Sequence, residues 1–183
     1  TQETYSKYRV GGNLKTVLSG IKNLVTTKKK LHSSSPFIII QYLAFSHNEH
    51  EIDEIKMLGK SLGVNEVKIK SAQIYAPDSS DLIPKNEKLS RYRKNANGKY
   101  EIKSKMANSC SRLWSSPVIT QDGQMIPCCF DKDAQHTLGK LNGQSLKTIW
   151  NGETYNQFRK QVFTNRAEID ICKNCTEGTK VWL

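Results

Sequence analysis

Apolar residues recur with a helical period in two stretches near the start of the chain. Between Leu14 and Val25 they follow the i, i+3, i+4, i+7 spacing of one helix face, and the lysines at 28–30 suit a helix C-terminus. This pattern predicts an amphipathic helix with Asn13 as its N-cap. A second helix is predicted to begin after Asn48, its plausible N-cap, with Glu49 and Glu51 in its first turns and Gly63 as the C-terminal glycine.

Two further stretches have the pattern of strands. Residues 37–45 are almost wholly apolar without alternation, which is typical of a strand buried on both faces of a parallel sheet. Residues 65–75 alternate between apolar and polar side chains. Helix, strand, helix, strand is the rhythm of a parallel β/α fold, although two strands are too few for an open sheet or a barrel. Gln41 interrupts the first strand, either as a hydrogen-bonded amide or as a residue facing a polar lumen.

The pattern changes after residue 75. Prolines, serines and the basic run at 91–94 predict a linker over residues 76–104, which would separate a β/α part at 1–75 from a small α+β module at 105–183. In the module, Asp122-Gly123 between two apolar runs predicts a β-hairpin.

Two short helices are expected after the hairpin. Ser145 would cap the first, and in the second Arg159 would lie on the polar side. Trp114 and Trp150 are expected in the core of the module, because a module this short needs large apolar side chains.

Charge and length limit the possible partners. The chain has 183 residues and a formal net charge of +11, with the basic residues spread along its length. A basic nucleic-acid-binding module that uses residues 28–30 and 91–94 is therefore an alternative, but we expect no nucleic-acid partner, because charge without a recognition motif is weak evidence. No apolar run spans a bilayer and no signal peptide pattern is present, so we expect no membrane partner and a cytoplasmic location.

The five cysteines carry the strongest chemical signal. Cys172 and Cys175 form a C-x-x-C pair, which in a chain without secretory features favours a metal or redox centre over disulfides. With Cys110 and Cys128 they make a set of four thiolates, which suits zinc and a 4Fe-4S cluster almost equally well. Cys129 is assigned to packing, with ligand exchange as the alternative, because neighbouring side chains in extended backbone point to opposite faces.

The residues around these cysteines resemble a known family. The motifs are C-x-x-L-W at 110–114, D-G-x-x-x-P-C-C-x-D at 122–131, S-L-K-T-I-W at 145–150 and C-K-N-C-T-E-G at 172–178. They closely resemble the auxiliary-cluster module of radical S-adenosylmethionine (SAM) enzymes, called SPASM, or twitch in its one-cluster form. Because no cysteine follows Cys175, the resemblance implies one auxiliary 4Fe-4S cluster, with Cys110, Cys128, Cys172 and Cys175 as its ligands.

The first 75 residues resemble the later half of the radical SAM partial (β/α) barrel, beginning just after its fourth strand. The resemblance implies that Arg9 and Asn48 approach the SAM cofactor, and that Gln41 and Lys70 approach the substrate. Each of these four residues is about as well explained as a surface or capping residue.

The C-x-x-x-C-x-x-C motif, which holds the radical-generating cluster of the family, does not occur in this sequence. The resemblance therefore implies the C-terminal part of a larger oxidoreductase, inactive alone, whose full length would bind SAM and a second 4Fe-4S cluster. Its partners would be a small-molecule or peptide substrate and a reductase or electron carrier. The alternative is that the chain is not part of an enzyme but a structural module that binds zinc through four cysteines.

Overall fold

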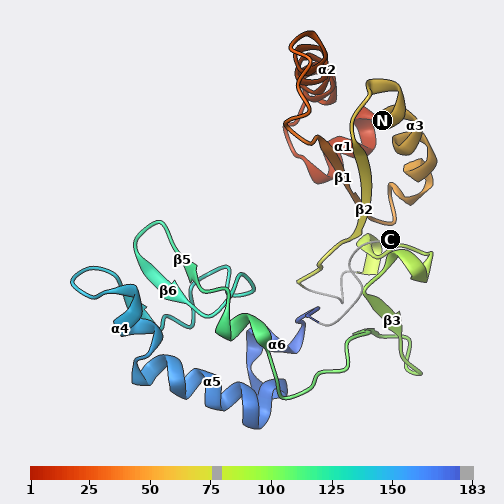
Figure 1. The fold of residues 1–183 in the computed structure, drawn as a ribbon. Coiled ribbons are helices and arrows are strands. Elements are labelled where there is room, and N and C mark those ends of the chain that lie inside the picture. Colours follow the sequence, from red (N-terminus) through yellow and green to blue (C-terminus); the bar gives the residue numbers. More distant parts are fainter. Residues whose placement is uncertain (76–79, 178–183) are drawn as a thin grey trace. The chain divides into compact units, whose positions relative to one another are not determined.

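The computed structural model describes residues 1–75 and 80–177, which form two compact units (Figure 1). The first unit extends to Lys103 and the second begins at Ser104. Together they make a mixed α/β structure of helices and small sheets. The elements of the first unit, in chain order, are α1 (Gln2–Tyr8), α2 (Leu14–Lys30), β1 (Ile39–Ala44), η1 (Glu49–Glu51), α3 (Ile52–Leu62), β2 (Glu66–Ser71), η2 (Ser80–Leu82), η3 (Glu87–Leu89), β3 (Tyr92–Lys94) and β4 (Tyr100–Ile102).

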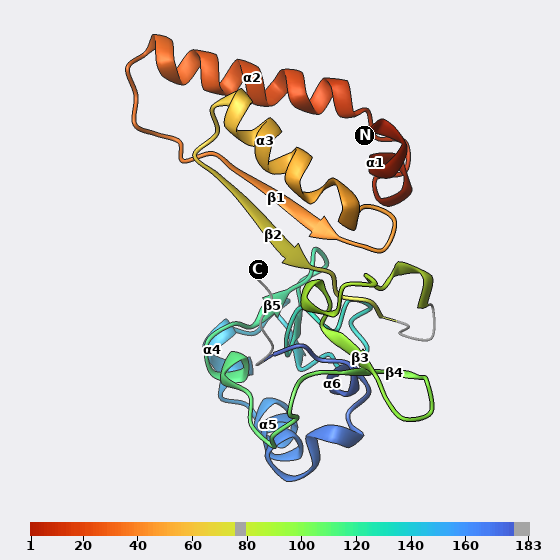
Figure 2. The ribbon, with the colours of Figure 1, turned by 90° about the vertical axis from the view of Figure 1, so that its right-hand side faces the viewer.

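The first unit is built on the parallel pair β1 and β2, in the register Ile39↔Glu66 to Ala44↔Ser71. Helix α3 packs against both strands, and α2 contacts α3 (Figure 2). As predicted, Asn13 caps α2, because its side chain accepts a hydrogen bond from the backbone N–H of Thr16. Gly63 ends α3 in the left-handed region at φ 77°. The β/α order predicted for residues 1–75 is therefore confirmed, whereas a partial barrel stays a prediction.

The prediction that β1 is buried on both faces is wrong. Gln41 is exposed and Ile39 is 44% exposed, while Ala44 at the other end of the strand is fully buried. Among the described residues β1 has β2 as its one neighbour, so the opposite edge of the strand is unpaired. An apolar strand therefore carries partly exposed side chains in this unit.

The stretch predicted as a linker is also different from expectation. Residues 76–79 lie outside the described residues, but the rest of 76–104 contains two short 3-10 helices and the antiparallel pair β3–β4. Ile74, Ile83 and Tyr92 form a small buried cluster, and Tyr100 and Ile102 pack against it. The Tyr92 hydroxyl donates to the carbonyl of Ile74 at 2.8 Å. These contacts make the stretch a folded part of the first unit.

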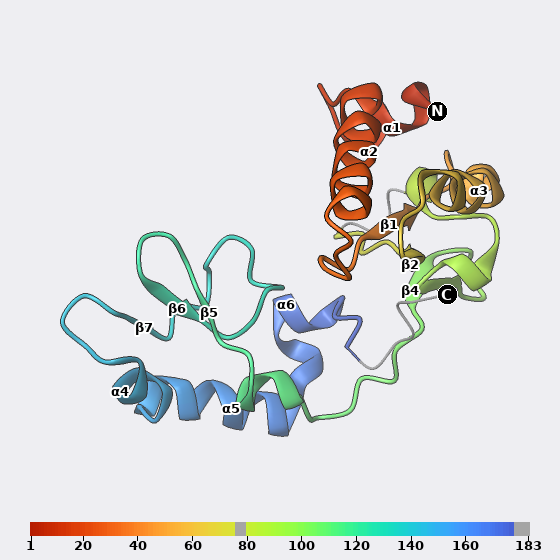
Figure 3. The ribbon, with the colours of Figure 1, turned by 45° about the horizontal axis from the view of Figure 1, so that its top comes forward.

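The second unit combines a three-stranded sheet with helices. Its elements are η4 (Ser111–Trp114), β5 (Val118–Ile119), β6 (Gln124–Ile126), β7 (Gly139–Lys140), α4 (Leu146–Trp150), α5 (Glu153–Asn165), η5 (Arg166–Glu168) and α6 (Asp170–Lys173) (Figure 3). The hairpin predicted around Asp122-Gly123 is present as β5–β6, with Gly123 at φ 78°. Gly139 pairs with Met125 as part of β7.

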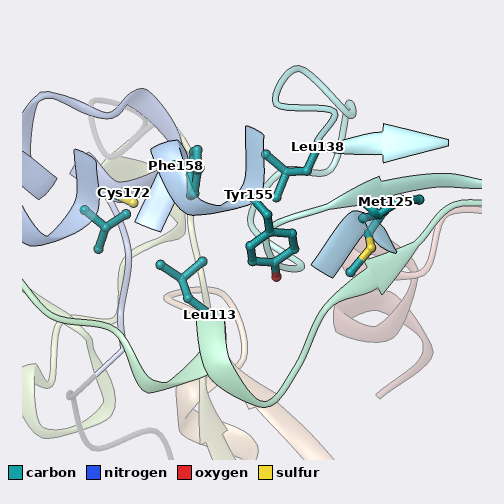
Figure 4. Packing of buried hydrophobic residues seen from close by; sticks show 8 residues of the cluster. Leu113, Met125, Leu138, Tyr155, Phe158 and Cys172 are labelled. Carbon is teal, nitrogen blue, oxygen red and sulfur yellow. The ribbon is translucent and has the colours of Figure 1, made fainter. Parts of the chain in front are cut away.

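A single apolar cluster fills the second unit, and Figure 4 shows side chains from η4, the sheet and α5 converging in it. Its buried members are Leu113, Met125, Leu138, Ile149, Tyr155, Phe158, Val162 and Cys172. Trp150 packs against the cluster, as predicted. Trp114 does not belong to it and is 56% exposed, which corrects the expectation that both tryptophans lie in the core.

Arg159 occupies a buried position on α5 rather than the polar face predicted for it. Its side chain is 4% exposed, and its Cζ lies 4.3 Å, 4.6 Å and 4.1 Å from the ring centres of Trp114, Trp150 and Tyr155. The guanidinium also donates to the carbonyls of Leu113 and Trp150. Cation–π contact and hydrogen bonds together compensate the burial of the charge.

No helix within residues 1–75 and 80–177 is both long enough and apolar enough to cross a membrane.

Candidate metal centre

The four predicted ligands come from three segments of the second unit. Cys110 immediately precedes η4, Cys128 follows β6, and Cys172 lies in α6 with Cys175 just after it. The C-x-x-C pair is a tight turn, because the N–H of Cys175 donates to the carbonyl of Cys172 at 2.9 Å. Cys172 and Cys175 are buried, while Cys110 and Cys128 are half-buried. The fold thus brings the hairpin, η4 and α6 to one region.

The four thiols interact electrostatically. Burial, together with the neighbouring thiols of Cys129, Cys172 and Cys175, raises the pKa of Cys128 to about 12. Burial likewise raises the pKa of Cys172 to about 11, with the thiols of Cys175 and Cys110 adding to the effect and Arg166 opposing it. A cluster of thiols this close together resists ionisation unless a positive centre is supplied.

Two N–H groups point at the sulfur of Cys175. Arg166 Nη2 lies 3.2 Å from Cys175 Sγ, and the backbone N–H of Glu177 lies 3.4 Å from the same atom. Hydrogen bonds to the ligand sulfurs are a recurring feature of protein iron–sulfur centres. The surroundings of Cys175 Sγ therefore match those of a cluster ligand.

A buried carboxylate shapes the loop after Cys128. Asp131 is 1% exposed, and its two carboxylate oxygens accept from the backbone N–H groups of Gln135 and His136 at 2.8 and 2.9 Å. The backbone N–H of Asp131 in turn donates to the carbonyl of Cys128 at 3.2 Å. Asp131 therefore fixes the backbone that presents Cys128, which explains why an aspartate stands three residues after it.

Cys129 is exposed, which corrects its assignment to packing. Its neighbour Cys128 is more buried, and so the two side chains do differ in direction as expected for adjacent residues. Cys129 does not join the core.

The set of four thiols suits a zinc ion and a 4Fe-4S cluster alike. A zinc ion binds all four sulfurs itself, each at about 2.3 Å. In a 4Fe-4S cluster each cysteine binds its own iron.

The residues predicted to bind cofactor or substrate lie in the first unit. Arg9 is exposed at the end of α1, with its Cζ 4.6 Å from the ring centre of Tyr8. Lys70 is partly buried in β2, beside Leu43 of β1, and Gln41 is exposed on β1. The roles of Arg9, Gln41 and Lys70 toward SAM and substrate stay predictions.

Asn48 has a structural role that the sequence suggested only in part. Its side chain makes no capping hydrogen bond to a helix N-terminus, which corrects the capping assignment. Instead Oδ1 accepts from the backbone N–H of Phe45 at 2.7 Å, and Nδ2 donates to the carbonyl of Leu43 at 3.0 Å. Asn48 is 7% exposed and holds the turn at the C-terminal end of β1.

Residues 110–176 match a protein-family model described as SPASM, an iron–sulfur cluster-binding domain. This part of the chain is therefore similar to SPASM domains, and the term SPASM domain below refers to residues 110–176. The match begins at Cys110 and includes Cys128, Cys172 and Cys175, the four residues whose thiols interact in the structure.

A curated relative supports the assignment. The S-adenosyl-L-methionine-dependent 2-deoxy-scyllo-inosamine dehydrogenase of Niallia circulans is 32% identical over 73 residues, which are 39% of this chain and 29% of that enzyme. The predicted resemblance to SPASM-containing radical SAM enzymes is thereby confirmed. The chain spans less than a third of the length of this relative.

A solved structure, titled as BtrN in an open conformation, is also similar to the chain. It shares 19% sequence identity, and the alignment covers 88% of this chain and 64% of that one with a TM-score of 0.34. A score of this size does not establish how the elements of the two chains correspond.

The sequence did not reveal two basic residues of the SPASM domain that lie near the cysteines. Arg166 donates to Cys175, and Arg112 lies near Cys128 and Cys129 while its Nε donates to Glu177 at 2.6 Å. Hydrogen bonding to Glu177 raises the pKa of Arg112, and the two thiols add to the shift. The sequence feature that could have indicated these two residues is their position near the predicted ligands. Arg112 follows Cys110, and Arg166 shortly precedes the C-x-x-C pair.

Proposed function

We propose that this protein is an oxidoreductase of the radical SAM type in which one auxiliary 4Fe-4S cluster supports the radical-based oxidation or modification of a substrate. Cys110, Cys128, Cys172 and Cys175 hold the cluster. The observation that carries the proposal has two parts: these four thiols lie close enough to interact electrostatically, and Cys175 Sγ accepts hydrogen bonds from two N–H groups.

The protein residues perform three tasks at this site. The turn of the C-x-x-C pair fixes the spacing of two thiolates, and Asp131 fixes the loop that carries a third. The apolar cluster around Leu113 and Phe158 excludes water from one side of the site. A bound 4Fe-4S cluster supplies one-electron redox chemistry here.

Electron acceptance is the role that we favour over direct substrate binding. Cys110, Cys128, Cys172 and Cys175 would supply one ligand to each iron of a 4Fe-4S cluster, which would leave none open to a substrate atom. The chemistry that such a cluster would supply is acceptance of one electron. Placing the substrate is the second possible role of the domain.

The substrate class is proposed from similarity alone. The relative from Niallia circulans is named as a dehydrogenase of 2-deoxy-scyllo-inosamine. By analogy we favour oxidation of a small-molecule alcohol over modification of a peptide. A reductase or electron carrier would exchange electrons with the clusters. Arg9 and Asn48 would contact SAM. Gln41 and Lys70 would contact the substrate.

Metal analysis of the intact protein tests the proposal. Anaerobic reconstitution should give a brown protein that carries about four irons at the SPASM domain. The iron at this domain is measured as the difference between the parent and a variant in which all four cysteines are replaced by serine. A colourless protein with one zinc per SPASM domain would instead support the structural zinc module.

A second measurement tests the redox role. Replacing Cys172 with alanine should abolish complete turnover of the intact enzyme, while the production of 5′-deoxyadenosine from SAM continues. Unchanged turnover in this variant contradicts an electron-accepting cluster.

A further inference from the structure

Arg166 contacts Ser109 and Cys175, which lie at the two ends of the cysteine-containing segment. It begins η5, is 4% exposed, and donates from Nη2 to Cys175 Sγ at 3.2 Å. Its Nη1 donates to the carbonyl of Ser109, the residue before Cys110, at 2.6 Å. One side chain therefore connects a predicted ligand at the end of the domain with the backbone of a predicted ligand at its start.

The backbone around Arg166 is held by the same neighbours. Its N–H donates to Asn108 Oδ1 at 3.1 Å, and Asn108 Nδ2 donates to the carbonyl of Thr164 at 2.8 Å. The end of α5 is thereby joined to the chain just before Cys110. This double attachment leaves the guanidinium little freedom to turn away from the sulfur.

The charge of Arg166 is directed at sulfur rather than at a carboxylate. Among residues 1–75 and 80–177 no carboxylate lies within ion-pair distance of its guanidinium. The thiols of Cys175, Cys110 and Cys172 all interact with it electrostatically. The buried guanidinium is held instead by hydrogen bonds to Cys175 Sγ and to the carbonyl of Ser109.

We infer that Arg166 is a positioning and redox-tuning residue of the auxiliary cluster. This inference rests on the proposed function, because it needs a cluster at the four cysteines. A reduced cluster carries one more negative charge than an oxidised one, and a fixed cation that also donates to a ligand sulfur stabilises the reduced form more. Arg166 thus makes the cluster a better electron acceptor.

Redox titration of the intact, reconstituted protein tests the role of Arg166. The variant Arg166→Gln removes the charge, and Arg166→Lys keeps the charge but loses the planar fork that reaches Cys175 and Ser109 together. Arg159→Gln is the matched control, because Arg159 is equally buried in the same unit but contacts aromatic rings and carbonyls. The midpoint potential of the auxiliary cluster is followed by electron paramagnetic resonance during reduction with dithionite.

We expect Arg166→Gln to lower the equilibrium constant for reduction at least tenfold, which for one electron is about 59 mV toward negative potential. Arg166→Lys should show a smaller shift in the same direction, and Arg159→Gln should show none. Equal potentials for the parent and Arg166→Gln overturn the inference, as does an equal shift in Arg159→Gln.

Iron content separates the possible failures. If the parent protein holds no cluster at the four cysteines, the proposed function fails and the inference fails with it. If the parent holds the cluster and its potential does not depend on Arg166, only the inference fails. If Arg166→Gln loses iron while Arg159→Gln keeps it, the positioning role is supported. The redox role is then tested with Arg166→Lys, whose midpoint potential should shift to more negative values as stated above.

Discussion

Gly59 of α3 lies directly against Val67 of β2, so that a Cβ at position 59 would clash with Val67 Cγ2. The valine is β-branched and its side chain has little freedom to turn aside. The close approach of α3 to the parallel sheet therefore depends on the absence of a side chain at this position.

Replacing Gly59 with alanine should destabilise the first unit. Overpacking of this kind costs about 1–3 kcal/mol, which urea unfolding of the protein would measure. Gly20→Ala in α2 is the matched control, because a Cβ there meets nothing within 4 Å. That variant should gain about 0.5–1 kcal/mol from the better helix propensity of alanine. Equal effects of the two substitutions would show that α3 does not pack on β2 as described.

The two phenylalanines of α5 should respond very differently to truncation. Phe158 is 6% exposed within the apolar cluster, and Phe163 is 46% exposed. Phe158→Ala should cost about 3–5 kcal/mol of unfolding free energy, because it opens a cavity in the core of the domain. Phe163→Ala should cost much less, and a larger loss from Phe163 than from Phe158 would contradict the packing described for α5.

Asn48 is expected to affect stability whether or not it contacts SAM. Asn48→Ala leaves the buried N–H of Phe45 without its acceptor, which should cost about 1–3 kcal/mol in thermal or urea unfolding. Gln41→Ala removes an exposed amide from the neighbouring strand, and its effect should stay within about 0.5 kcal/mol. A neutral Asn48→Ala would mean that its hydrogen bonds to the end of β1 are dispensable.

Single cysteine variants should divide the five cysteines into two classes. Serine at 110, 128, 172 or 175 should reduce the iron and the brown absorbance of the SPASM domain after anaerobic reconstitution, because each variant removes one thiolate ligand. Cys129→Ser should retain both, since its side chain is exposed and adjacent to Cys128. Loss of iron from Cys129→Ser, with retention in Cys128→Ser, would reverse the assignment of this pair.

The local elements could be predicted because their signals are local. The cap at Asn13, the left-handed Gly63 and the turn at Asp122-Gly123 each depend on residues within a few positions of one another. Their conformations follow from the backbone preferences of those residues. The motif spacing around the cysteines identified the domain for the same reason.

The features that sequence reasoning missed depend on distant contacts. The periodic pattern of α5 placed Arg159 on the polar side, yet three aromatic rings from two other elements and its own helix enclose it. The predicted linker folds because Ile74, Ile83 and Tyr92 meet from separate segments. No window of neighbouring residues contains either arrangement.

The ends of the second unit lie close together. The Ser104 hydroxyl donates to the carbonyl of Glu177 at 3.0 Å, and Arg112 forms an ion pair with the side chain of Glu177. A folded unit whose first and last residues touch can be inserted into another chain, or its ends can be joined and reopened elsewhere, with little change in its interior. The cysteine-bearing unit is therefore suited to being carried from one protein to another as a self-contained insert.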